Sequence, residues 1–210
     1  MINSLEAKRA FFPSVNIVEN TIEGTNVFAL RKKFGTPLFI VSKRALKTKI
    51  SEFISLLKRT YSNSRIAFSM KTNNLASLNR FFKDNGFLAE TVSDYEYWLA
   101  GKLGFKKNEI ILNGPSKSHD LLRQAITDSA LIHIDNFSEL SEIVKLTNRL
   151  KKRIRVGIRV NPEVTGRQSR FGFSLKNGDA WKACLEIIAG KWVDLAGLHY
   201  HLGSNIFSLN

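Results

Sequence analysis

Lys71 is the residue of this sequence whose type and position most clearly suggest chemistry. It closes the apolar run Ile66-Ala67-Phe68-Ser69-Met70, which we predict to be a buried strand, and Thr72-Asn73-Asn74 follow it. Apolar surroundings disfavour an ammonium group, and the neutral amine that they favour is nucleophilic and forms imines. Lys71 is therefore a candidate Schiff-base lysine. The same residues would also fit a lysine that simply emerges into solvent at a strand end, followed by a helix cap at residues 72–74.

A second motif, Gly197-Leu198-His199-Tyr200-His201-Leu202-Gly203-Ser204-Asn205, combines an aromatic ring with a small turn. A strand that delivers His201 places its imidazole beside Gly203 and Ser204, whose backbone amides can receive a phosphate. We favour a binding role for His201. For His199 we favour a strand residue that faces the core or the helices. No carboxylate or further histidine stands at ligand spacing, so we predict no metal site.

The elements that would position these residues alternate regularly along the chain. Apolar spacing predicts strands at 38–41, 66–70, 88–92, 110–112, 131–134, 154–160 and 195–200, and helices at 46–57, 75–82, 95–103, 121–126, 140–150 and 180–188. Strands that alternate with helices form parallel βαβ units. We divide the chain into an N-terminal extension, 1–34, and a domain, 35–210.

A parallel barrel explains this domain better than a doubly wound sheet. Most strands end in polar or glycine-containing text, which is where a (β/α)8 TIM-type barrel assembles its active site. No Gly-x-Gly-x-x-Gly turn follows the early strands, although a dinucleotide-binding sheet would be expected to carry one. Setting aside the strand at 38–41, we count six barrel strands. A closed barrel needs eight, so we expect this one to be incomplete.

Composition narrows the class of protein. The 210 residues carry a net charge of +14, which suits a nucleic-acid binder, but the basic residues form short clusters such as Arg31-Lys32-Lys33 and lack interleaved aromatics. Solvated helix faces explain them better. Cys184 is the only cysteine and reads as core filler. Without a long apolar run or a signal-like start, we expect a cytoplasmic protein.

Both motifs resemble those of the type III pyridoxal-phosphate decarboxylases, the family of diaminopimelate, ornithine and arginine decarboxylases. Phe68-Ser69-Met70-Lys71-Thr72-Asn73 is similar to the family's Tyr-Ala-x-Lys-x-Asn, with phenylalanine for tyrosine. His201-Leu202-Gly203-Ser204 is similar to its His-x-Gly-Ser turn. The resemblance covers the chain from about residue 35 to its end. It implies that Lys71 holds pyridoxal 5'-phosphate, that His201 stacks on the pyridine ring, and that Gly203 and Ser204 contact the phosphate.

Further segments resemble the family less closely. Glu90 stands where the family usually has aspartate, and Arg159 resembles its strand arginine near the cofactor. Ser169-Arg170-Phe171-Gly172-Phe173 resembles its Lys-Phe-Gly segment, with arginine for lysine. Ser93 and Glu96 resemble its Ser-x-x-Glu, although the same pair makes a good helix capping box. Glu96 and Asn73 are accordingly supporting residues of the implied site.

The resemblance implies decarboxylation of a basic or diamino amino acid through a Schiff base on Lys71. It also implies that the last barrel strands, a C-terminal β-domain and the dimer contacts lie outside this sequence. The complete protein would then be a homodimer, or this chain would associate with a complementing C-terminal half. Two alternatives stay open: a non-catalytic homologue that acts as a regulatory binding protein, and a basic nucleic-acid-binding protein.

Overall fold

The computed structural model describes residues 17–18, 20–162, 170–201 and 203. The chain divides into two compact units, residues 1–64 and residues 65–210. The boundary expected from the sequence lies thirty residues earlier, after residue 34, and stays a prediction. Each unit is described by itself below.

The first unit contains short strands and two helices. Its elements are β1 (Ile17–Val18), β2 (Thr21–Ile22), β3 (Thr25–Asn26), α2 (Val27–Phe34) and α3 (Lys43–Thr60). The strands form an antiparallel sheet in the order β1-β2-β3. The Glu23 carboxylate accepts hydrogen bonds from Ser42 Oγ at 3.0 Å and from Arg44 Nε at 2.6 Å, which links the turn after β2 to the start of α3.

One expectation for this unit requires correction, and several of its elements were not predicted. The N-terminal extension, in which the sequence predicted no helix or strand, contains β1 to β3 and α2. The strand expected at 38–41 is absent: these residues are irregular, they pair with no strand in the described part of the chain, and Phe39 is 97% exposed. An apolar segment of this length becomes a strand only when a neighbouring strand satisfies its backbone groups.

The second unit alternates strands with helices, as predicted. Its strands are β4 (Ala67–Ser69), β5 (Leu88–Thr91), β6 (Ile110–Leu112), β7 (Leu131–Ile134), β8 (Ile154–Asn161), β9 (Phe173–Ser174) and β10 (Val193–His199). Its helices are α4 (Ala76–Asp84), α5 (Asp94–Lys102), α6 (His119–Asp128), α7 (Phe137–Leu150) and α8 (Asp179–Ala189), with short 3-10 turns η1 (Met70–Thr72) and η2 (Lys107–Glu109). Only β9, which is two residues long, was not predicted in this unit.

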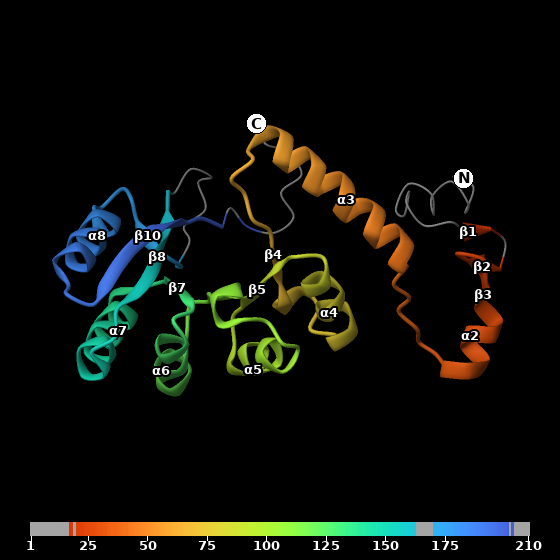
Figure 1. Ribbon diagram of the computed structural model, residues 1–210, viewed down its shortest axis with the longest axis horizontal. Helices are drawn as coiled ribbons and strands as arrows, with labels where there is room; N and C mark the ends of the chain where they lie inside the picture. Colours follow the sequence, from red (N-terminus) through yellow and green to blue (C-terminus); the bar gives the residue numbers. More distant parts are fainter. Residues whose placement is uncertain (1–16, 19, 163–169, 202, 204–210) are drawn as a thin grey trace. The chain divides into compact units, whose positions relative to one another are not determined.

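The sheet confirms the α/β barrel topology of the second unit. The strands lie in the order β10-β8-β7-β6-β5-β4, every pair is parallel, and β9 pairs with β8 beside this path. Helices α4 to α8 lie together on one side of the sheet (Figure 1). All six predicted barrel strands are therefore present, with β4 and β10 at the two edges of the described sheet.

The two faces of the sheet differ in chemistry. In β8, Val156, Ile158 and Val160 belong to the apolar core that the strands share with the helices. Because side chains alternate along a strand, Gly157 and Arg159 belong to the opposite face. Cys184 of α8 packs against the same core, as expected of a filler residue, and burial raises the pKa of its thiol. The helices thus cover an apolar face and leave a polar one.

None of the helices in the described part of the chain is long and apolar enough to cross a membrane.

Candidate functional site

Lys71 follows β4 in the 3-10 turn η1 and not in the strand itself. Met70 fills the core beside it, while the Lys71 side chain is exposed. The burial that the sequence suggested is therefore wrong for this lysine. Thr72 Oγ1 donates to Ser69 O at 2.7 Å and Asn73 Oδ1 accepts from Leu75 N at 3.0 Å, so local hydrogen bonds shape the turn that presents the amine.

The turn that carries Lys71 is linked to the next two strands through Glu90 at the end of β5. One carboxylate oxygen of Glu90 accepts a short hydrogen bond from Ser69 Oγ. The other accepts from Asn113 Nδ2 at 2.9 Å. Both oxygens of Glu90 are thus engaged by this chain's own side chains, which places its carboxylate beside the Lys71 turn as a positioning group.

The same network continues to two stacked histidines. Asn113 Nδ2 lies 3.2 Å from His199 Nε2, and the His199 and His133 rings stack with their centroids 4.7 Å apart. A Cβ on Gly157 would lie 2.7 Å from the His133 ring, so only glycine leaves room for this histidine. His199 is a strand residue, as expected, but it faces polar partners. Burial, with the nearby charges of His199 and Lys117, lowers the pKa of His133 to about 4.

We call Ser69, Glu90, Asn113, His133 and His199 the histidine cluster. Its members come from β4, β5, the residue after β6, β7 and β10.

His201 lies two residues beyond His199 and is exposed. Burial of part of the ring lowers its pKa, and the positive charges of Lys71 and Arg159 lower it further, while Glu90 opposes them. Lys71, Glu90, Arg159 and His201 all stand at or just beyond the carboxyl ends of parallel strands. Gly203 has φ +134°, a conformation that favours glycine. Ser204 lies outside the described residues.

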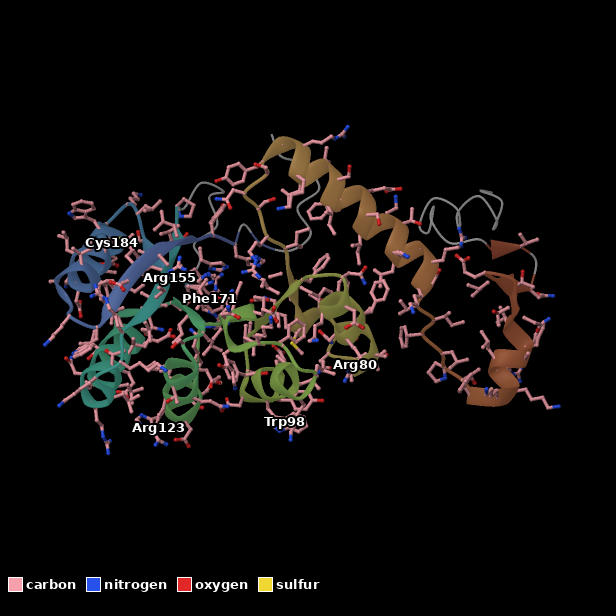
Figure 2. All side chains as sticks on the ribbon, viewed as in Figure 1. Arg80, Trp98, Arg123, Arg155, Phe171 and Cys184 are labelled. Carbon is pink, nitrogen blue, oxygen red and sulfur yellow. The ribbon has the colours of Figure 1, made fainter. Side chains whose placement is uncertain are left out.

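Arg159 is held at the end of β8 by a carboxylate and an aromatic ring. Its Nη1 lies 3.2 Å from Asp135 Oδ1, and its guanidinium lies over the Phe171 ring at 5.0 Å. Phe171 is followed by Gly172. A Cβ at position 172 would lie 2.8 Å from Arg159 O, so this position has no room for a side chain. The segments around Arg159 and Phe171, which resemble two separate parts of the family's sequence, are therefore in contact. Figure 2 shows Phe171 at the sheet, with Trp98 and Arg123 on the outer side of the helices.

A buried ion pair lies next to Arg159. Lys117 Nζ donates to Gly114 O at 2.7 Å and His133 O at 2.9 Å, and it lies 2.5 Å from Glu139 Oε1. The Lys117 side chain is 0% exposed and that of Glu139 is 6% exposed. We call Lys117, Asp135, Glu139 and Arg159 the charged cluster.

Ser93 and Glu96 have the geometry of a helix start. Ser93 Oγ accepts from Glu96 N at 3.3 Å, and Glu96 Oε2 accepts from Val92 N at 2.8 Å. Ser93 is therefore the N-cap of α5, while Glu96 binds the backbone of the residue before the cap, so the full capping box suggested by the sequence is not formed. Asn73 accepts from the backbone two residues later, and α4 begins without a side-chain cap.

The sequence did not identify Lys117, Asn113, His133 or Asp135 as members of the site. Each stands directly at, or a few residues after, the end of a predicted strand, which is the one signal that could have identified them.

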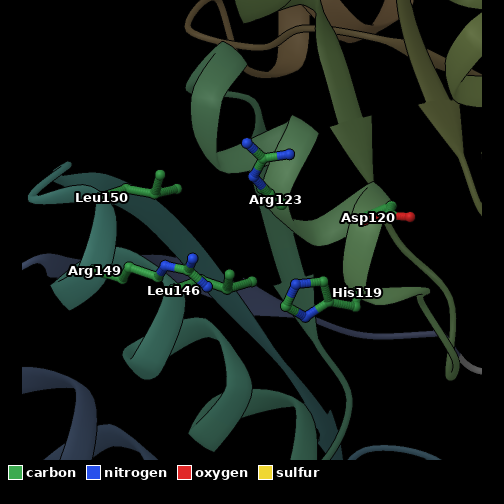
Figure 3. Close-up of a pocket in the computed structure, with 6 residues that line it drawn as sticks. All are labelled: His119, Asp120, Arg123, Leu146, Arg149 and Leu150. Atoms are coloured by element: carbon green, nitrogen blue, oxygen red, sulfur yellow. The ribbon is translucent and has the colours of Figure 1, made fainter.

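A separate pocket between α6 and α7 is shown in Figure 3. It is lined by His119, Asp120, Arg123, Leu146, Arg149 and Leu150. It includes none of the predicted site residues and lies on the helical side of the sheet, so it does not extend the site.

The described residues fit a pyridoxal cofactor. An amine at Lys71 suits its aldehyde, the exposed His201 ring suits its pyridine face, and the small turn at Gly203 together with Arg159 suits an anionic group. The three side chains come from the carboxyl ends of β4, β8 and β10, where parallel barrels bind their ligands.

Comparison with known proteins identifies the family and its cofactor. The family model of the pyridoxal-dependent decarboxylase, pyridoxal binding domain, matches residues 47–210. The diaminopimelate decarboxylase of Archaeoglobus fulgidus is 30% identical over 201 residues, covering 90% of this chain and 46% of that protein. The enzyme of the same name from Bacillus subtilis is 27% identical, covering 89% and 45%. The chain thus spans about half the length of these relatives.

Solved structures show the same fold. The crystal structure of diaminopimelate decarboxylase from M. jannaschii in co-complex with L-lysine matches with a TM-score of 0.85 at 26% identity, covering 91% of this chain and 48% of that one. The lysine/ornithine decarboxylase of Vibrio vulnificus, at 19% identity and a TM-score of 0.67, shares the fold. Because the family model covers most of its length, this chain belongs to the pyridoxal-dependent decarboxylases, of which it contains the pyridoxal-binding domain.

Proposed function

We propose that the protein containing this domain decarboxylates a diamino carboxylic acid of the diaminopimelate type, using a cofactor held on Lys71. The observation that carries the proposal is the position of Lys71, Glu90, Arg159 and His201 at or just beyond the carboxyl ends of β4, β5, β8 and β10 in one parallel sheet. The relatives named diaminopimelate decarboxylase support the reaction and the substrate class. The co-complex of one such enzyme with L-lysine supports a ligand with a side-chain amine.

Each residue has a distinct role in this proposal. Bound pyridoxal phosphate would supply an electron-accepting ring. Lys71 Nζ would hold its aldehyde as a Schiff base and, once displaced, would carry a proton at the same nitrogen. The His201 ring would cover one face of the cofactor, leaving the other to the substrate. Glu90 would fix the Lys71 turn through Ser69.

The remaining roles follow the family resemblance. Gly203 and Ser204 would bind the phosphate group, and Arg159 would contribute a positive charge near the cofactor. Because the chain spans about half of its relatives' length, we propose that a second copy, or a polypeptide corresponding to the other half, completes the site. A cytoplasmic location stays a prediction.

Reduction of the cofactor-bound protein with borohydride tests the role of Lys71. We expect peptide mapping to find a pyridoxyl group on Lys71, and we expect Lys71→Arg to lose both that adduct and the release of carbon dioxide from diaminopimelate. Lys83→Arg, a change of the same kind in α4, is the control and should keep both. A pyridoxyl group on another lysine, with Lys71 unmodified, would refute the proposal.

A further inference from the structure

Lys117 and Glu139 form an ion pair that water does not reach. Lys117 has three acceptors around its ammonium group, the Gly114 and His133 carbonyls and the Glu139 carboxylate. Burial lowers the pKa of Lys117 and raises the pKa of Glu139, and the attraction between their charges opposes both shifts. Such a pair is expensive to desolvate, and apolar residues of similar volume often stabilise a fold at least as well. Stability alone is therefore a weak reason for its presence.

Glu139 connects this pair to the loop that carries Asp135. Its Oε1 faces Lys117, and its Oε2 accepts from the backbone N–H of Asp135 at 3.1 Å. Asn136 Oδ1 accepts from Glu139 N at 2.9 Å and begins α7. The backbone of Asp135 is therefore fixed on one side by a carboxylate that a buried lysine holds in place.

Asp135 in turn holds Arg159. The Asp135 side chain is 5% exposed and that of Arg159 is 12% exposed, with Oδ1 and Nη1 3.2 Å apart. A contact between two such shielded charges depends strongly on distance. Displacement of the Asp135 loop would therefore remove the carboxylate that holds the guanidinium in place.

We propose that Lys117 and Glu139 are positioning residues that set the place of Arg159 through Asp135. The inference rests on the proposed function, in which Arg159 faces the cofactor, and it adds a specific support for that arginine. Neither Lys117 nor Glu139 has to touch the cofactor or the substrate. Their effect is carried by the Asp135 backbone and then by the Asp135 carboxylate.

The pKa of His201 reports the position of Arg159 without any cofactor. The charged groups that act on this histidine are Lys71, Arg159 and Glu90. Arg159→Gln should raise the pKa of His201 in an NMR titration of the cofactor-free chain. Glu139→Gln should raise it too, because a single amide oxygen cannot serve both Lys117 and Asp135 N. If Glu139→Gln acted only by removing a negative charge, it would lower the pKa of His201. A raised pKa therefore indicates displacement of Arg159, and a lowered pKa indicates the direct charge effect.

The control is Glu142→Gln, the same change one turn later in α7. Glu142 pairs with His119 on the surface at 2.7 Å, and we expect this variant to leave the pKa of His201 unchanged. If Glu139→Gln does not fold, the volume-matched pair Lys117→Met/Glu139→Leu provides the second test. It removes both buried charges together with the acceptor for Asp135 N, and it should also raise the pKa of His201.

A cofactor titration extends the test to the proposed function. Glu139→Gln should weaken the binding of pyridoxal phosphate on the order of tenfold, by analogy with the loss seen when outer partners of metal ligands are removed. Glu142→Gln should bind normally. A raised His201 pKa without weaker binding would support the positioning of Arg159 and refute its role toward the cofactor. An unchanged His201 pKa in folded Glu139→Gln and in the double variant would overturn the inference itself.

Discussion

The histidine cluster and the charged cluster both lie near the carboxyl ends of the strands of one sheet, but they are built from different interactions. In the histidine cluster, a carboxylate, an amide and two stacked rings are joined by hydrogen bonds and ring contact. In the charged cluster, two ion pairs are buried side by side. Loss of one member of the first cluster removes a hydrogen bond or a ring contact, whereas loss of one member of the second leaves an unpaired buried charge.

This difference separates what each cluster does for the site. The histidine cluster joins the Lys71 turn, through Ser69, Glu90 and Asn113, to His199 at the end of β10, two residues before His201. The charged cluster holds Arg159 from the other side. The residues proposed to meet the cofactor thus depend on two supports, which touch where Lys117 Nζ donates to His133 O. Most of the variants below change side chains of one support at a time.

The largest effect is expected in the charged cluster. Lys117→Met should lower the free energy of unfolding by about 3–5 kcal/mol, because it leaves the Glu139 carboxylate buried without its partner. Lys117→Met/Glu139→Leu should lower it by less than the single change. Urea unfolding of both variants measures the difference. A single variant as stable as the unchanged chain would show that the pair is not buried in solution.

The histidine cluster should instead respond to pH. In the folded chain the pKa of His133 is about 4, below its ordinary value of about 6.5 in an unfolded chain. Between these values the unfolded chain binds a proton that the folded chain does not, so stability falls as the pH falls from 6.5 toward 4. The full contribution is about 3 kcal/mol.

His133→Gln, which cannot titrate, provides the comparison. We expect urea unfolding at pH 7.0, 5.5 and 4.5 to show a weaker loss of stability in this variant than in the unchanged chain. The lowered pKa of His199 would leave part of the slope in place. If the free energy of unfolding falls equally with pH in the variant and in the unchanged chain, His133 is not the source of the pH dependence.

The sequence predicted the scaffold of the second unit far better than its polar clusters. Regular alternation of apolar segments fixes where strands and helices fall, because each must bury one face. The same reasoning failed at residues 38–41, where pairing and not hydrophobicity decides whether a strand forms. It also placed Lys71 in a buried strand, although the strand ends at Ser69 and the next turn exposes the side chain.

The clusters escaped prediction because their members are distant in the sequence. Asn113 and His199 are 86 residues apart, and Lys117 lies in the loop before α6 whereas Glu139 lies in the first turn of α7. Glu90 and Arg159 could be identified from the family resemblance. The resemblance did not predict that other side chains of this chain would bind both of them. A single sequence predicts where strands end. Which side chains of neighbouring strands contact one another depends on the register between the strands, which the sequence does not give.

The smallest expected effect concerns two loops with the same local motif. Ser93 begins α5 as Asn136 begins α7, and in each case a glutamate three residues later accepts from the backbone N–H that precedes the cap residue. Ser93→Ala should lower the free energy of unfolding by about 1 kcal/mol, and Ser93→Asp, which keeps an acceptor, should be nearly neutral.

The glutamates distinguish these loops. Of the two glutamates, only Glu139 has a buried lysine beside it in the part of the chain that the structure describes. Glu96→Gln should therefore cost little in stability, while Glu139→Gln should cost several times as much. Chemical unfolding of the two variants gives the ratio directly. Equal losses would mean that capping, and not the ion pair, is the main role of both glutamates, and the contrast between the β5–α5 and β7–α7 loops would then reduce to a shared helix start.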